Sequence, residues 1–221
     1  MLRLDLDRQL GQLQQEVVSL AEIVDKATMR AVDALKRRDL VESQQVVQED
    51  DYIDQKRYEI EDRCIDLIAT QQPMARDLRA IIALLHITVE LERMGDYAEG
   101  ISKISLLMGE EAPLKPLIDI PRMAEKATLM LRNSIDSLVS RDVVKANQVL
   151  QDDDEVDDLY DQVYRELLVF MLQDPQIIQR ATYLLWAAHD LERIADRATN
   201  IAERVIYLVT GKMVESGLSR Y

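Results

Sequence analysis

The sequence contains an internal repeat, and this repeat constrains the fold more strongly than any other feature. Segments of the first half recur in the second half in the same order: 38–54 as 141–157, Pro73 as Pro175, and 84–101 as 184–201. The spacing between matched positions shortens around the two prolines, where we expect a surface turn and where chain length changes most easily. The chain is therefore expected to consist of two homologous units.

Each unit is expected to form three long helices, because apolar residues recur at intervals of three and four. In the last of these helices they form one stripe: Leu184, Ala187, Leu191, Ile194, Ala198, Ile201, Val205 and Leu208. Pro73 and Pro175 end the second helix of each unit, since proline lacks an amide hydrogen and disfavours helix in the residue before it. The predicted helices cover residues 4–36, 39–70, 76–107, 119–139, 142–172 and 177–209.

The composition also favours helix, because the chain has only 6 glycines, 5 prolines and 5% aromatic residues. Short connections impose antiparallel packing on neighbouring helices. The sequence thus predicts an all-α protein made of two tandem antiparallel three-helix bundles related by internal duplication. The proline-containing segment 109–121 separates them, which gives a first unit at residues 1–111 and a second at 112–221.

The charge of the chain points away from nucleic acids. Its 41 acidic and 27 basic residues give a net charge of −14, which repels phosphate backbones and attracts cations or basic protein surfaces. The single cysteine, Cys64, cannot form an internal disulfide, and the first residues lack the apolar core of a signal peptide. Apolar runs are too short to cross a bilayer. We expect a cytoplasmic protein that associates with membranes only peripherally, through partners.

Carboxylates occur in pairs four residues apart, and such pairs project from one face of a helix. Each unit has one pair on its second helix and one on its third: Asp50 with Asp54, Glu92 with Asp96, Asp153 with Asp157, and Glu192 with Asp196. Asp50 and Asp153 interrupt apolar stripes at equivalent points, where a carboxylate needs a partner. A hard divalent or trivalent cation would supply one. A solvated acidic face is the alternative.

If the stripes face the core, the third-helix and sixth-helix carboxylates lie on the outward side, which predicts surface sites. This argues against a ferritin-like di-iron centre, whose ligands point into a helical core. His86 and His189 are not repeated, so we expect both to be structural or exposed. No nucleophile with a base and no glycine-rich phosphate loop is recognisable, and we expect no enzymatic activity.

Two segments of the third helices resemble the paired signatures of the PhoU family. They are Leu91-Glu-Arg-Met-Gly-Asp-Tyr-Ala-Glu-Gly-Ile101 and Leu191-Glu-Arg-Ile-Ala-Asp-Arg-Ala-Thr-Asn-Ile201, and the segments 72–79 and 207–211 extend the likeness. The resemblance implies a negative regulator of high-affinity phosphate uptake and of the phosphate-starvation two-component response. Such an adaptor would contact the ATPase subunit of a phosphate ABC transporter and a phosphate-sensing histidine kinase. We also expect a homodimer.

The resemblance further implies multinuclear metal clusters, with iron in some members and zinc, manganese or magnesium as alternatives. Carried over to this chain, the ligands are Asp50, Asp54, Glu92, Asp96, Asp153, Asp157, Glu192 and Asp196. Ala195 and Gly100 depart from the family pattern, and Gly100 lacks the amide that Asn200 keeps, so the two sites are expected to differ. Two other functions remain open: metal storage or redox chemistry on the same carboxylates, and a structural adaptor without metal.

Overall fold

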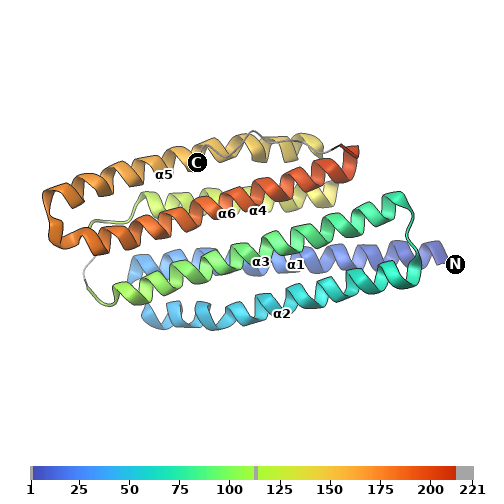
Figure 1. The fold of residues 1–221 in the computed structure, drawn as a ribbon, viewed down its shortest axis with the longest axis horizontal. Helices are drawn as coiled ribbons and strands as arrows, with labels where there is room; N and C mark the ends of the chain where they lie inside the picture. The colour runs from blue at the N-terminus through green and yellow to red at the C-terminus, as the bar shows by residue number, and fades with distance from the viewer. Residues whose placement is uncertain (1, 112–113, 213–221) are drawn as a thin grey trace.

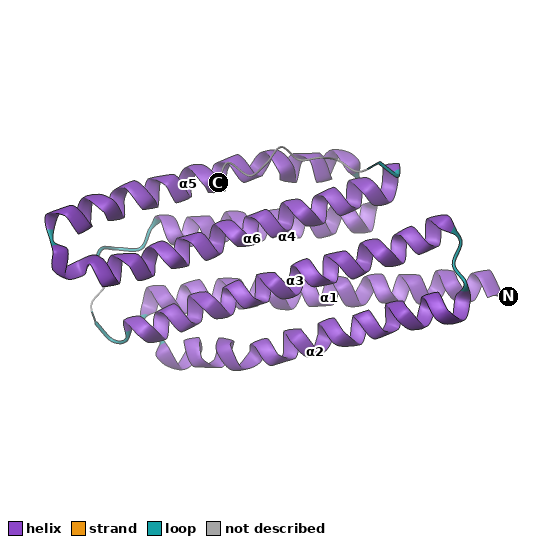
Figure 2. Ribbon diagram, in the orientation of Figure 1, coloured by secondary structure: helices purple, strands orange, loops and turns teal. Residues whose placement is uncertain are grey.

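The computed structural model describes residues 2–111 and 114–212, and within these ranges helix is the only regular structure (Figure 2). The bounds agree closely with the six predicted helices, which are confirmed. A short 3-10 helix, η1 (Pro175–Ile177), follows the fifth. The six α-helices are α1 (Leu2–Arg37), α2 (Leu40–Gln71), α3 (Ala75–Met108), α4 (Asp119–Ser140), α5 (Val143–Gln173) and α6 (Ile178–Thr210).

The helices form two antiparallel three-helix bundles that lie side by side (Figure 1). Helices α1 to α3 make the first bundle, and α4 to α6 make the second. The bundles meet through α3 against α6 and through α1 against α4, whereas α2 and α5 lie on the outer sides. Because the same helices of each repeat face one another, the duplicated units are related by an approximate twofold axis. The predicted fold class is confirmed.

One continuous apolar core runs through both bundles. The predicted stripe of α6 is buried from Leu184 to Val205, and Leu208 is half-buried at its end. Cys64 is fully buried on α2 and packs as a small core residue. The space between the bundles is therefore packed with side chains, and each third helix has neighbours on three sides.

The turns inside each bundle repeat one local design. Arg38 and Arg141 adopt the left-handed conformation, with φ of 61° and 55°. The next residue then caps the following helix: Asp39 accepts a hydrogen bond from the backbone N–H of Glu42, and Asp142 accepts two from the start of α5. These side chains satisfy backbone donors that would otherwise lack partners, so the turn residues account for the start of both second helices.

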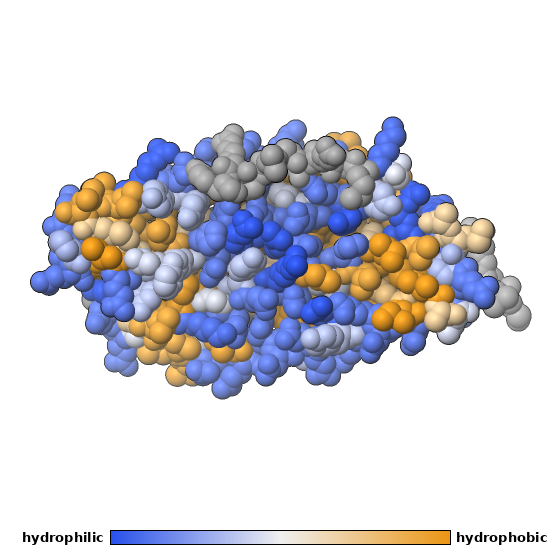
Figure 3. Space-filling view, in the orientation of Figure 1, coloured by the Kyte–Doolittle hydropathy of each residue, from blue (hydrophilic) through white to orange (hydrophobic). Residues whose placement is uncertain are grey.

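The predicted boundary between the units falls in the connection from α3 to α4. Residue 112 lies outside the described residues, and the boundary stays a prediction. On the face shown in Figure 3, hydrophilic residues cover the middle, and apolar residues gather toward both ends. In the described ranges, none of the helices combines the length and the apolar character that a membrane span requires.

Candidate functional site

The first acidic cluster lies between α2 and α3 and contains all four predicted residues of the first unit. The negative charges of Asp54 and Asp96 act on Asp50, and so does that of Glu99 one turn further along α3. Burial is the largest influence, and together with these charges it raises the pKa of Asp50 to about 7. Burial and neighbouring carboxylates also raise the pKa of Glu92 and of Asp96.

The second acidic cluster repeats this arrangement between α5 and α6. Burial, then the charges of Asp157 and Asp196, raises the pKa of Asp153 to about 7. Burial and Asp196 likewise raise the pKa of Glu192 to about 7, although Arg193 acts against them. The structure therefore brings each predicted set of four carboxylates together from two helices. In each set, partial burial makes the charged form of the carboxyl groups less favourable.

The predicted position of these side chains at the surface is correct for Asp96 and wrong for Glu192. Asp96 is exposed, but only 6% of Glu192 is exposed. The physical reason is that Glu192 lies beside Asp153 and Asp157 of α5, so the packing of α5 on α6 covers its side chain. The buried Oε2 of Glu192 accepts no hydrogen bond from the described part of the chain, and Nδ1 of the half-exposed His189 is 3.4 Å from it.

Different arginines compensate the two clusters. In the first cluster, Arg57 of α2 donates a hydrogen bond of 2.9 Å to Glu92 and another of 2.9 Å to Glu61. Tyr160 occupies the equivalent position of α5. In the second cluster Arg193 of α6 is the nearby cation, with its Nη1 2.8 Å from an oxygen of Asp196. The two clusters therefore differ in the arginines that compensate them.

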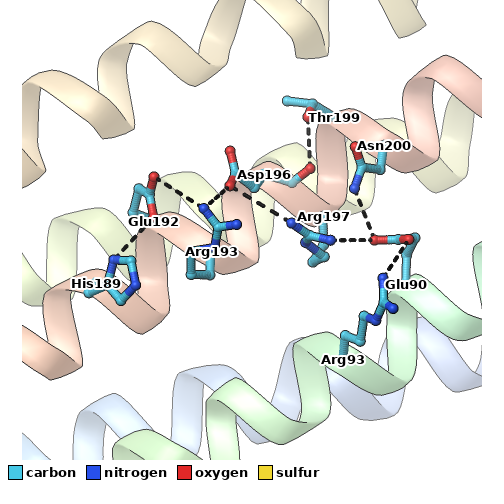
Figure 4. Close-up of polar contacts among 9 residues, drawn as sticks. All are labelled: Glu90, Arg93, His189, Glu192, Arg193, Asp196, Arg197, Thr199 and Asn200. Carbon is cyan, nitrogen blue, oxygen red and sulfur yellow. Dashed lines mark hydrogen bonds and ion pairs between the residues drawn. The ribbon is translucent and has the colours of Figure 1, made fainter. Parts of the chain in front are cut away.

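The second cluster also connects to the other bundle (Figure 4). Arg197 lies 3.9 Å from Asp196 and pairs at 3.2 Å with Glu90 of α3, which also accepts a hydrogen bond of 3.0 Å from Asn200. The amide of Asn200 thus serves the contact between bundles. Its counterpart Gly100 faces Asp190 at the symmetric point: a Cβ there would lie 2.9 Å from a carboxylate oxygen of Asp190.

Gly95 marks a close approach between α2 and α3 at the first cluster. A Cβ atom at this position would lie 3.0 Å from Ile53 and 3.2 Å from Oδ1 of Asp50. The equivalent residue of the second unit, Ala195, is fully buried, so α5 and α6 accommodate its methyl group. The backbone can therefore approach the acidic cluster more closely in the first unit than in the second.

The chemistry of both clusters suits a hard cation, because carboxylate oxygens are the ligands that such ions prefer. The raised pKa values, and an Oε2 of Glu192 that accepts no hydrogen bond from a described residue, show carboxylates whose charge is only partly compensated. In the part of the chain that the structure describes, no three acidic, histidine or cysteine side chains converge closely enough to enclose an ion. The donor set fits a metal, and the side chains would have to turn inward to hold it.

Together, the duplicated bundles and the paired acidic clusters define a class of all-helical, two-unit proteins that carry carboxylate groups between the second and third helix of each unit. Comparison with known proteins identifies the family. The model of the PhoU domain matches residues 17–105 and 120–205, one match for each unit. The chain belongs to the PhoU family.

Relatives of full length support this assignment. The chain is 41% identical to the "Phosphate-specific transport system accessory protein PhoU homolog" of Aquifex aeolicus, over 95% of each chain. It is 36% identical to the homologue of the same description from Clostridium acetobutylicum, over 97% of this chain and 99% of that one. The crystal structure of PhoU from Pseudomonas aeruginosa superposes with a TM-score of 0.89 at 34% identity, covering 93% of this chain and 99% of that one.

Proposed function

We propose that this protein is a non-enzymatic accessory protein of a phosphate transport system that restrains high-affinity phosphate uptake. Its family membership and the names of its full-length relatives support this role. The observation that carries the proposal is the match of the PhoU domain to both units, which leaves little of the chain for another function. The protein would act in the cytoplasm and reach the membrane only through its partners.

The partners in this proposal are the ATPase subunit of a phosphate ABC transporter and a phosphate-sensing histidine kinase. Through the kinase the protein would also restrain the phosphate-starvation response. The net charge of −14 supports contact with basic surfaces of partner proteins, and the proposal includes a homodimer. Affinity capture from cells grown in high phosphate, together with gene-expression measurements after deletion, tests this role. Capture of neither partner, with unchanged expression of phosphate genes, would contradict it.

The proposal also assigns metal ions to the two acidic clusters. The ligands would be Asp50, Asp54, Glu92 and Asp96 in the first unit, and Asp153, Asp157, Glu192 and Asp196 in the second. A bound divalent or trivalent cation would supply positive charge to carboxylates that now repel one another. Iron in multinuclear clusters is the leading choice, with zinc, manganese and magnesium as alternatives. The support is the raised pKa of Asp153 and Glu192, together with the Oε2 of Glu192 that accepts no hydrogen bond from a described residue.

Elemental analysis of protein purified without chelator tests the metal assignment. Asp153→Asn with Glu192→Gln should remove metal from the second cluster and leave that of the first. Asp158→Asn is the matched control, because Asp158 is an exposed residue of α5 outside the cluster. Metal content that does not change in the double variant would contradict the assignment.

The same measurements separate the alternative functions. Loading with many iron atoms per chain, or redox turnover, would favour a metal-storage protein over a regulator. If Glu92→Ala with Asp96→Ala changes neither the metal content nor the signalling of cells, the protein is a structural adaptor without metal. The regulator with metal predicts a few bound ions and altered signalling in that double variant.

A further inference from the structure

Arg38 carries a buried charge that makes no hydrogen bond to a described residue. It lies in the turn between α1 and α2, at the end of the molecule where α3 finishes and α6 begins (Figure 1). All three nitrogens of its guanidinium group are buried, and none of them donates a hydrogen bond within residues 2–111 and 114–212. A guanidinium carries five N–H donors and cannot lose its charge in a protein, so burial without an acceptor is unfavourable.

The surroundings of Arg38 increase this imbalance. Arg180, in the first turn of α6, is close enough that its positive charge adds to burial in lowering the pKa of Arg38. Glu111 is the carboxylate that acts on Arg38 in the opposite direction. Its Oε2, however, pairs with Nε of Arg180 at 3.2 Å. Glu111 therefore acts on both cations, and its Oε2 is already engaged by Arg180.

The repeat supplies an internal comparison. Arg141 occupies the equivalent turn between α4 and α5 with nearly the same left-handed backbone, which glycine would adopt with less strain. Its side chain lines an open cavity of about 380 Å³, together with Arg76 and Asp77. Solvent can therefore hydrate Arg141, whereas the nitrogens of Arg38 are closed off. The anomaly belongs to the first turn and not to the turn design that both units share.

We propose that Arg38 and Arg180 form a binding site for a small tetrahedral oxyanion such as inorganic phosphate. The planar fork of a guanidinium donates two parallel hydrogen bonds to phosphate oxygens, and two arginines match the charge of a dianion. The first turn of α6 contains no acidic residue, and the positive end of this helix favours an anion there. The inference goes beyond the regulatory role proposed above and does not depend on any partner.

Glu111 gives the site a way to open. Its side chain is 69% exposed, and its carboxylate occupies the position beside Arg180 that the anion would take. An incoming oxyanion would therefore replace this carboxylate on Arg180 and complete the coordination of Arg38. This competition predicts the direction in which each substitution changes the affinity for the anion. Removing the charge of Glu111 should strengthen anion binding, whereas removing the charge of either arginine should weaken it.

Isothermal titration calorimetry of metal-free protein in a chloride buffer at pH 7.5 tests the proposal, with inorganic phosphate, sulfate and acetate as separate titrants. Wild-type protein should bind one phosphate saturably. Arg38→Gln and Arg180→Gln should each lower the affinity at least tenfold, and Glu111→Gln should raise it. Arg141→Gln is the matched control and should bind as wild type does. Equal binding of sulfate that also depends on Arg38 supports a general tetrahedral oxyanion site.

A thermal melt provides a second readout. Phosphate should raise the melting temperature of wild-type protein but not that of Arg38→Gln. If Arg38→Gln does not fold, Arg180→Gln carries the test. The proposal is overturned if wild-type protein binds no phosphate or sulfate, if it binds acetate alone, or if Arg38→Gln binds as tightly as wild type. Equal loss in Arg141→Gln would also overturn it. Partner capture and phosphate-gene expression are independent of these outcomes.

Discussion

Replacing Asp153 by asparagine should stabilise the metal-free protein. Asp153 makes no ion pair or hydrogen bond to another described residue, and burial and neighbouring carboxylates raise its pKa from 3.8 to about 7. Asparagine has nearly the same shape and no charge. If the acidic cluster exists to bind a cation, its members should destabilise the fold when the cation is absent, and neutralising one of them should relieve that cost.

The size and the pH dependence follow from proton linkage. Between pH 3.8 and about 7 the folded protein holds a proton on Asp153 that the unfolded chain has released, so wild-type stability falls as pH rises through this window. About three pH units correspond to about 4 kcal/mol at most. Solvent screening of this half-buried group reduces the expected effect to about 1–2 kcal/mol. The gain from Asp153→Asn should be near zero below pH 4 and complete above pH 7.

Urea unfolding of chelator-treated protein at pH 5 and pH 8 measures this difference. With a denaturant slope of about 2–3 kcal/mol/M, the midpoint of Asp153→Asn should exceed that of wild type by about 0.5 M at pH 8 and by less at pH 5. The control Asp158→Asn should shift little at either pH. A lower midpoint for Asp153→Asn at pH 8 would refute the reasoning, because it would mean that the carboxylate stabilises the fold without metal.

Further predictions concern the contact between the bundles, the close approach of α2 and α3, and the thiol. Glu90→Gln should lower the free energy of unfolding by about 1–3 kcal/mol, because it weakens two hydrogen bonds from α6. Asp190→Asn, at the symmetric point, should raise it at pH 8, since burial raises the pKa of Asp190 to about 7; urea unfolding measures both. Gly95→Leu should cost about 1–3 kcal/mol through overpacking against α2, whereas Gly11→Ala, on an open helix surface, should add about 0.5–1 kcal/mol in the same assay. Iodoacetamide should modify Cys64 only after unfolding, because the thiol is fully buried and its pKa is raised to about 11; mass spectrometry detects the adduct.

The sequence predicted the helices well because local rules determine them. The apolar stripe of α6 and the prolines after α2 and α5 place helix and turn without reference to the rest of the chain. Packing between the bundles was harder to predict. The apolar stripe of α6 does not predict that the opposite side of this helix packs against α3. The residues on that side, such as Asp190 and Asn200, are polar. Polar residues at such a contact look like surface residues when read along a single helix.

The acidic clusters illustrate the same limit. The repeat identified four carboxylates in each unit, and their pairing across two helices followed from the fold. Glu99 is not among the predicted residues of the first cluster. Its spacing of three residues from Asp96 could have indicated that the two side chains lie on one face of the helix. Arg57 falls at the spacing of the apolar stripe of α2, so the sequence alone does not reveal its contact with Glu92. Burial of Glu192 depends on the packing of α5 on α6, and the periodicity of α6 alone contains no information about that packing.

The two acidic clusters have the same spacing in sequence but different energetic contexts. Arg57 compensates the first cluster from within its own bundle. In the second, Arg197 lies between Asp196 and Glu90, so the same guanidinium serves the cluster and the contact between bundles. Any change of charge at Asp196 alters the field that Arg197 experiences, and with it the strength of the pairing to Glu90. Events at the second cluster therefore affect the packing of α6 on α3, whereas the pairing of Arg57 with Glu92 keeps the first cluster's compensation between α2 and α3.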